Sequence, residues 1–441
     1  MRKNRIHIIV RSLVNICRFI LSVVFIFSGF VKTIDPKGFA YKIEEYLLHF
    51  HLDGLTAGYI PLVLSVLLSA VEFLMGVYLF FGIRKRMTSL VVLLFMSVMT
   101  LLTCYIYYFN PVQDCGCFGD ALVLSNGETF VKNVLLLFCA IFLYRNRKLV
   151  FRIVSERNQW LISIYSIFFI LFFAAWSLYY LPVFDFRPFR IGADIPSMLA
   201  ASKQVEYDTE FILEKNGERR TFTLENYPDS TWTFVDSKTR SLSKGSSTDV
   251  VSDFMIYDMA SGEDVTAEML ADTTYSFWLI APEIDSSVMY SDVVNDVYDY
   301  CIDNQFHFNC ITASSLQETE SWKQRIELQC KTYSADKKLL QTIIRSDPGL
   351  LLVKDGVILG KWSKNDFPDV NELPLLTNGA EVAPQNNLST LLKSLMWYIF
   401  PLLFITLADR MWIGYTYYRR YRCRKTIIIK SKRNENENCS R

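Results

Sequence analysis

The chain contains little histidine and has no strong charge bias. It has four histidines among 441 residues and a formal net charge of +1. A structural zinc site needs a full set of Cys and His ligands, and no histidine lies beside the most closely spaced cysteines. The sequence also lacks a nucleophile–His–acid set and a phosphate-binding glycine loop. These absences argue against a metalloenzyme, a hydrolase or a kinase, and the charge balance gives no support to nucleic-acid binding.

Apolar residues, in contrast, are abundant. The chain is 51% hydrophobic and 15% aromatic, with a mean hydropathy of +0.19, which is too apolar for one soluble domain and too charged for a bare helical bundle. Residues 182–390 contain 33 acidic and 18 basic side chains, so this segment has a net charge of −15 and the remainder +16. This division predicts a membrane protein with an acidic external domain and basic cytoplasmic rims.

Six apolar runs approach the length of about twenty residues that a helix needs to cross a bilayer. They cover residues 12–31, 59–81, 88–109, 130–144, 160–181 and 392–409. Alternate connections are rich in Lys and Arg, which predicts a multi-pass protein of the inner (cytoplasmic) membrane with both termini in the cytoplasm. Residues 182–390 are then periplasmic, as is the loop at 110–129, which has no Lys or Arg. We interpret the first run as a retained anchor, because no small-residue cleavage site follows it.

The external loop contains the sequence Asp-Cys-Gly-Cys-Phe-Gly-Asp at positions 114–120. Cys115 and Cys117 can meet because Gly116 permits the backbone angles that this requires. A bond across so small a ring is strained, and strained, exposed disulfides tend to exchange. We therefore predict a redox pair and no metal site, although two unrelated loop cysteines or half of a metal site are alternatives. The flanking carboxylates of Asp114 and Asp120 should raise the thiol pKa values and slow attack unless a partner supplies positive charge.

Three further cysteines, Cys301, Cys310 and Cys330, belong to the predicted external domain. Together with the loop pair they make an odd number, so at least one remains unpaired or pairs transiently. Cys310 lies within an apolar strand pattern, which is more typical of a buried small hydrophobic residue than of a redox group.

Glu72 lies in the middle of the second apolar run, where a carboxylate normally faces a partner or a cavity. Arg18 in the first run is predicted at a similar depth, counted from the cytoplasmic ends at the rise of a helix. We therefore predict an intramembrane ion pair between Arg18 and Glu72, with a structural role favoured over a proton or quinone role.

Several motifs resemble a known family. They are Ser-Gly-x-x-Lys at positions 28–32, Asp-Pro-x-x-Phe-Ala at 35–40, Glu72, and Cys-Gly-Cys-Phe-Gly at 115–119. Together they resemble the DoxX-like group of redox-associated membrane proteins that includes the methylamine-utilisation protein MauE. The resemblance covers about residues 10–150. It implies a four-helix bundle linked to disulfide handling or quinone-coupled redox, with Cys115 and Cys117 as the redox pair and methylamine metabolism as the associated process. The six-helix layout is similar to the larger DoxX-type proteins of Bacteroidetes.

The external segment begins with predicted strands and then alternates between predicted strands and helices. The run at 211–224 places Asn-Gly between two alternating stretches, which predicts a hairpin. Strands are predicted at 275–280 and 306–312, helices near 288–304, 315–326 and 335–345, and a second hairpin at 350–362. The order β-α-β-α-β-β predicts an α/β sandwich.

This second half resembles a thioredoxin-like domain. The Phe-Trp strand and the Asp-Pro-Gly before the last hairpin correspond to that fold, which implies that Pro348 is its peptide-binding cis-proline. Where the family has Trp-Cys-x-x-Cys, this chain has Ala-Pro-Glu-Ile-Asp at 281–285. Without a thiolate at that position, the domain should bind a peptide or partner rather than exchange disulfides. A cap that merely stabilises the bundle is the alternative.

The predicted fold is therefore an all-α membrane bundle, with a four-helix core and six transmembrane helices in total, plus a periplasmic α/β thioredoxin-like domain. The expected parts are the membrane domain at 1–150, a fifth helix at 160–181, a β-rich segment at 182–270, the thioredoxin-like domain at 271–375, a sixth helix at 392–409 and a basic tail at 410–441. Two functions remain open. One is a thiol-redox oxidoreductase component that passes electrons to a periplasmic protein partner or a quinone. The other is a non-enzymatic membrane scaffold whose external domain recruits a partner.

Overall fold

The computed structural model describes most of the chain. The described residues are 2–56, 58–110, 112, 115–203, 207–215, 218–222, 233–241, 251, 253–377 and 387–438. Contacts divide the chain into two compact units. Unit 1 comprises Met1–Pro111, Asn126–Ala175 and Asn387–Arg441, and unit 2 comprises Val112–Ser125 and Trp176–Asn386. The loop with the cysteine pair therefore groups with the α/β part and not with the helices that flank it in sequence.

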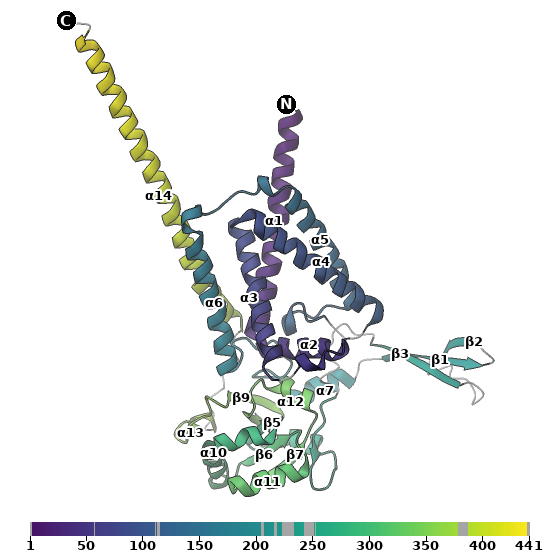
Figure 1. Ribbon diagram of the computed structural model, residues 1–441. Coiled ribbons are helices and arrows are strands. Elements are labelled where there is room, and N and C mark those ends of the chain that lie inside the picture. Colours follow the sequence, from purple (N-terminus) through teal and green to yellow (C-terminus); the bar gives the residue numbers. More distant parts are fainter. Residues whose placement is uncertain are drawn as a thin grey trace. The chain divides into compact units, whose positions relative to one another are not determined.

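Unit 1 is helical (Figure 1). Its helices are α1 (Arg2–Ile34), α2 (Pro36–His49), α3 (Ile60–Phe81), α4 (Lys85–Phe109), α5 (Asn126–Arg145), most of α6 (Gln159–Tyr179) and α14 (Asn387–Asn438). Short 3-10 helices lie at Asp53–Leu55, Arg147–Leu149 and Glu156–Asn158. Among the described residues, six helices are long and apolar enough to cross a membrane, and α2 is too short. These six coincide with the six predicted apolar runs, and the model confirms a helical membrane part.

Small residues set the packing of α1 against α3. A Cβ atom placed on Gly29 would lie 2.4 Å from the backbone nitrogen of Phe73, and one on Gly76 would lie 2.6 Å from that of Ile26. In a bilayer, helices associate by close packing rather than by hydrophobic burial, and glycine lets the backbones approach. These two contacts fix which residues of α1 and α3 are level with each other.

The start of α2 is set by the two residues Asp35 and Pro36. Asp35 is the N-cap, and its carboxylate accepts a hydrogen bond of 2.9 Å from the backbone nitrogen of Gly38. Pro36 follows at the first helical position, where its missing N–H costs nothing. The Asp-Pro dipeptide therefore starts a separate helix directly after α1.

Unit 2 contains a six-stranded mixed sheet in the order β4-β7-β6-β5-β8-β9. The strands are β4 (Tyr257–Asp258), β5 (Ser276–Ala281), β6 (His307–Thr312), β7 (Lys331–Ser334), β8 (Gly349–Lys354) and β9 (Val357–Ser363). The helices are α7 (Ile195–Lys203), α9 (Thr266–Leu270), η6 (Ile284–Tyr290), α10 (Ser291–Asp303), α11 (Leu316–Ile326), α12 (Lys337–Ile343) and α13 (Leu373–Thr377). Strands β5, β6 and β7 run parallel, while β8 is antiparallel to β5 and to β9.

Both faces of this sheet are covered. Phe277 and Leu279 of β5 pack with Val294 of α10 and Trp322 of α11 in one buried cluster. The alternate residues of β5 pack in a second cluster with α9 and α12. Because both faces are buried, β5 is apolar from Phe277 to Ala281. The expected α/β arrangement is confirmed in its coarse form.

A second sheet lies between residues 207 and 241. It has the order β2-β1-β3, with β1 (Tyr207–Lys215), β2 (Glu218–Phe222) and β3 (Thr233–Ser241). Strands β1 and β2 pair in antiparallel register, from Phe211 opposite Phe222 to Lys215 opposite Glu218. The predicted hairpin is confirmed, although its Asn-Gly turn and the end of the predicted run at 223–224 lie outside the described residues.

Candidate functional site

The cysteine pair lies in the connection between α4 and α5, next to a short 3-10 helix η2 (Gly119–Ala121). The sulfur atoms of Cys115 and Cys117 are 2.9 Å apart. Gly116 has a φ of +63°, in the left-handed region that glycine adopts without steric cost. The backbone nitrogen of Gly119 donates to the carbonyl oxygen of Gly116 at 3.1 Å and closes the turn. Small movements would bring the two sulfurs to bonding distance.

The two thiols differ in exposure. Cys115 is buried, with 6% of its surface exposed, together with Val112 and Phe118. Cys117 is half-buried. Asp114, the first of the two flanking acids, lies outside the described residues. The loop therefore presents Cys117 more openly than Cys115.

Asp120, the second flanking acid, has a cationic partner within unit 2. Nη2 of Arg345 donates to Oδ2 of Asp120 at 3.2 Å, and the Arg345 side chain is 7% exposed. The residue order gave no signal of this contact, because 225 positions separate the partners. A buried guanidinium beside this carboxylate offsets its negative charge.

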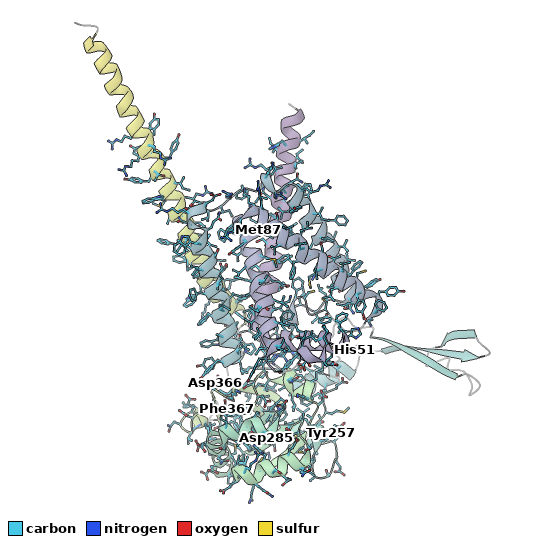
Figure 2. The ribbon with its side chains drawn as sticks, viewed as in Figure 1. His51, Met87, Tyr257, Asp285, Asp366 and Phe367 are labelled. Carbon is cyan, nitrogen blue, oxygen red and sulfur yellow. The ribbon has the colours of Figure 1, made fainter. Side chains whose placement is uncertain are left out.

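The α/β domain has no thiol where a thioredoxin-like domain would have its redox motif. β5 ends at Ala281 and η6 begins at Ile284. Glu283 and Asp285 form ion pairs with Lys337 and Arg325, respectively, and Asp285 is labelled in Figure 2. Charged contacts thus lie at the start of the helical segment after β5, and residues 281–285 contain no cysteine for thiol–disulfide exchange.

The Asp347–Pro348 peptide bond is cis. Oδ1 of Asp347 accepts a hydrogen bond of 2.5 Å from the hydroxyl of Ser286. Burial raises the pKa of Asp347, and Glu283 raises it further, while the Ser286 hydrogen bond opposes the shift. The structure therefore places Pro348 immediately before β8, near the segment that follows β5. The peptide-binding role of Pro348 stays a prediction.

The other three cysteines of unit 2 are all buried. Cys301 and Cys310 have no exposed surface, and Cys330 is 6% exposed. Burial raises the pKa of Cys301 to about 12. The hydrogen bond to Cys330 and complete burial raise the pKa of Cys310 well above its ordinary value. Burial and raised pKa values make Cys301 and Cys310 inert in the folded domain. The hydrogen bond to Cys310 lowers the pKa of Cys330, but that thiol is also buried. Cys310 is the buried hydrophobic residue that its strand pattern predicts.

A second polar site lies inside the helical unit. Nζ of Lys32 donates to both carboxylate oxygens of Glu72 at 2.9 Å, and the side chains are 3% and 6% exposed. The hydroxyl of Ser28 donates to Oε2 of Glu72 at 2.8 Å. The ring of Phe39 lies 4.8 Å from the Lys32 ammonium. The site thus contains an ion pair, a hydroxyl donor and an aromatic face.

The predicted pair between Arg18 and Glu72 is wrong. Nη1 of Arg18 donates to the carbonyl oxygen of Phe151 at 2.6 Å, and the guanidinium lies 4.7 Å from the ring of Phe19 and 4.2 Å from that of Phe151. The close approach of α1 and α3 at Gly29 makes residues 28–32 level with Glu72 and places Arg18 near the other end of α3. The prediction missed Lys32, although Lys32 is part of the Ser-Gly-x-x-Lys motif.

Comparison with known proteins supports the membrane part. Residues 10–145 match the family model of the methylamine utilisation protein MauE. Residues 207–244 match the model of a domain of unknown function, DUF8463. The six apolar helices and the first match together make this a multi-pass membrane protein.

Similarity to individual proteins is limited. No curated protein sequence matches the chain. Among solved structures, one similar chain is a secreted Mycobacterium tuberculosis disulfide oxidoreductase homologous to E. coli DsbE. The identity is 11%, the match covers 29% of this chain and 95% of that one, and the TM-score is 0.23.

Proposed function

We propose that the protein exchanges disulfides with protein partners at a membrane surface through Cys115 and Cys117. The observation that carries this proposal is the 2.9 Å separation of the two sulfurs in a turn that Gly116 makes possible. Their unequal exposure supplies the second requirement, because one thiol must meet the partner and the other must displace it.

The exchange balances without a metal. The Cys117 thiolate attacks one sulfur of a partner disulfide, which forms a mixed disulfide and releases the other partner sulfur as a thiolate. The Cys115 thiolate then attacks the Cys117 sulfur, which closes the Cys115–Cys117 disulfide and releases the second partner sulfur. The partner gains two electrons and, from solvent, two protons. The same steps in reverse oxidise a partner dithiol, and the reduced pair is then reoxidised by an acceptor of two electrons and two protons, such as a membrane quinone.

The resemblance of residues 10–145 to MauE favours a role in maturing a disulfide-containing periplasmic protein, with methylamine utilisation as the associated process. The alternating basic connections favour the inner membrane, with the cysteine loop on the periplasmic side. If the α/β domain binds partners as a thioredoxin-like domain does, Pro348 contributes to partner binding. The domain then recruits the partner, and the loop performs the chemistry.

Oxidised glutathione provides a direct test on the reduced, full-length protein in detergent. The wild type should release both glutathione molecules and form a Cys115–Cys117 disulfide, detected by mass spectrometry. Cys115→Ser should accumulate a mixed disulfide at Cys117, because no thiol is left to resolve it. Cys117→Ser should react slowly, because Cys115 is buried.

Cys104→Ser is the control, since Cys104 is an exposed cysteine on α4 that does not belong to the loop. It should behave as the wild type. A stable mixed disulfide on the wild-type loop would show that Cys115 does not resolve it and would sink the proposal. If partner maturation in cells is unaltered when both loop cysteines are serine, the scaffold function is favoured instead.

A further inference from the structure

We infer that Arg345 of the α/β domain is a positioning residue for the thiol pair, which holds the cysteine loop and offsets the charge of its carboxylate. This inference rests on the proposed function and deepens it. It assigns to a domain without redox cysteines a direct part in tuning the thiols of the membrane loop.

The geometry of Arg345 is fixed from two sides. Nη1 donates to the carbonyl oxygen of Gln341 at 2.6 Å, while Nη2 donates to Oδ2 of Asp120 at 3.2 Å. The first bond ties the guanidinium to α12, and the second ties it to η2 in the loop. With 7% exposure, the Arg345 side chain cannot swing freely into solvent. A buried, doubly bonded guanidinium is therefore suited to hold its carboxylate in one place.

The contact lies close to the thiols along the chain. Asp120 is three residues after Cys117, and η2 begins at Gly119. The loop is packed on the other side of the cysteines as well, since Val112, Cys115 and Phe118 are buried. Fixing Asp120 thus restrains the same short turn that brings the sulfurs together.

Other charged side chains lie near Arg345. Lys361 of β9 lies close enough to Arg345 for the guanidinium to lower the Lys361 pKa. Asp185 accepts from both Arg187 and Lys361, so those two cations are paired with their own carboxylate. The guanidinium of Arg345 is the cation in contact with Asp120, and it offsets the charge of that carboxylate. This lowers the obstacle to thiolate formation that an isolated carboxylate would create.

The position also orients the loop within the α/β domain. Arg345 precedes Pro348 by three residues, in the segment between α12 and β8. If the domain recruits its partner near Pro348, Arg345 holds the exchanging thiols at the same end of the domain.

The test measures the rate at which iodoacetamide alkylates Cys117 in the reduced, full-length protein as a function of pH. Arg345→Ala should slow the reaction at pH 7 by about threefold to tenfold and move the profile to higher pH, because Asp120 is then unopposed. Arg345→Lys keeps the charge and should retain most of the wild-type rate. Asp120→Asn should not slow the reaction, and in the Arg345→Ala background it should restore the rate to near the wild-type value.

This pattern separates charge balance from a purely structural role. If Arg345 only held the loop in place, Arg345→Ala would expose Cys115 and accelerate its alkylation, and Asp120→Asn would restore nothing. Unchanged rates in Arg345→Ala, or failure of Asp120→Asn to restore them, would overturn the inference.

Folding is checked in the same samples through Cys301, which has no exposed surface and should stay unreactive. If Cys301 reacts in Arg345→Ala, that variant is not folded, and the inference is then tested with the two single variants Arg345→Lys and Asp120→Asn. Rates at least as high as half the wild-type rate in both support the inference, and a lower rate in Asp120→Asn contradicts it. Alkylation needs no partner and no acceptor, so a failure here leaves the glutathione test of the proposed function unaffected.

Discussion

Lys32 and Glu72 form a two-pronged ion pair between α1 and α3, with Nζ 2.9 Å from each carboxylate oxygen and both side chains almost fully buried. Ser28 donates to the same carboxylate. A charge inside a membrane bundle is tolerated when it is paired and hydrogen-bonded. The pair therefore links the two helices that pack most closely at Gly29.

Breaking this pair should destabilise the bundle strongly. Glu72→Gln leaves the Lys32 ammonium buried without a counter-ion. Lys32→Met leaves the Glu72 carboxylate buried without a counter-ion. Each should cost about 3–5 kcal/mol in the free energy of unfolding, measured by SDS titration of the detergent-solubilised protein. The double variant should cost less than the sum, because no uncompensated charge remains.

Arg18→Met combined with Glu72→Gln is the control for this cycle. Since Arg18 bonds to the Phe151 carbonyl and not to Glu72, the two effects should add within about 0.5 kcal/mol. Coupling between Arg18 and Glu72, or additivity between Lys32 and Glu72, would contradict the structure.

The close contact of α1 and α3 makes a second prediction. In Gly29→Ala the new methyl group would lie 2.4 Å from the Phe73 nitrogen and 2.8 Å from the Ser69 carbonyl oxygen. Backbone atoms cannot move aside cheaply, so the loss should be about 1–3 kcal/mol by the same titration. Gly54→Ala is the matched control, because nothing lies within 4 Å of its Cβ position. Equal stabilities of the two variants would argue against the observed helix packing.

The sequence was informative where local signals decide the structure. Hydrophobic length predicted the six apolar helices. In the α/β part, the continuous apolar run of β5 and the Asp-Gly hairpin of β8 and β9 indicated strands at nearly their observed positions. Each of these signals lies within a few residues of the element that it predicts.

Features that depend on register or on distant residues could not be predicted. β7 is four residues long and has no clear alternation, so no local pattern indicated a strand between the predicted helices at 315–326 and 335–345. Counting residues from assumed helix ends matched Arg18 to Glu72, whereas glycine contacts set the true register and bring Lys32 there. The Arg345–Asp120 contact joins residues 225 positions apart and has no local signature.

A buried charge cluster predicts acid sensitivity of the α/β part. Oδ1 of Asp185 accepts from Nε of Arg187 at 2.8 Å, and Oδ2 accepts from Nζ of Lys361 at 3.1 Å. Burial alone would raise the pKa of Asp185, but Arg187 and Lys361 outweigh it and lower that pKa below its ordinary value. At Lys361 burial dominates and lowers the pKa to about 8, because one carboxylate partner is opposed by neighbouring cations.

The sign of the pH effect follows from the depressed pKa of Asp185. Its contribution to stability is complete above its ordinary pKa, near 3.8, and is lost as the pH falls below that value toward the folded-state pKa. We expect the apparent melting temperature of the full-length protein to fall between pH 4 and pH 2. Asp185→Asn should have a lower melting temperature at pH 6 and a weaker dependence over this range. An unchanged slope in this variant would exclude Asp185 as the source.

The membrane orientation can be checked with introduced cysteines and an impermeant maleimide. If the alternating basic connections set the topology, Met289→Cys should be labelled in cells whose inner membrane is intact, because residue 289 lies in the external segment and is 85% exposed. Lys148→Cys, at an exposed position after α5, should be labelled only after lysis. The wild type gives the background from native cysteines. The opposite labelling pattern would reverse the predicted topology.

The last prediction concerns the order of reactivity among the cysteines of unit 2. Cys117 is half-buried and Cys115 is 6% exposed, so limiting iodoacetamide should modify Cys117 first in the reduced protein. Cys301 is fully buried and has a pKa of about 12, which leaves it roughly a thousandfold less thiolate than an ordinary thiol at neutral pH. It should react only when the protein unfolds in guanidinium. Peptide-resolved mass spectrometry at several reaction times measures all three rates in one sample. If Cys115 reacts before Cys117, the attacking and resolving roles are exchanged. If Cys301 reacts as fast as either of them in the folded protein, Cys301 is not buried as the structure shows.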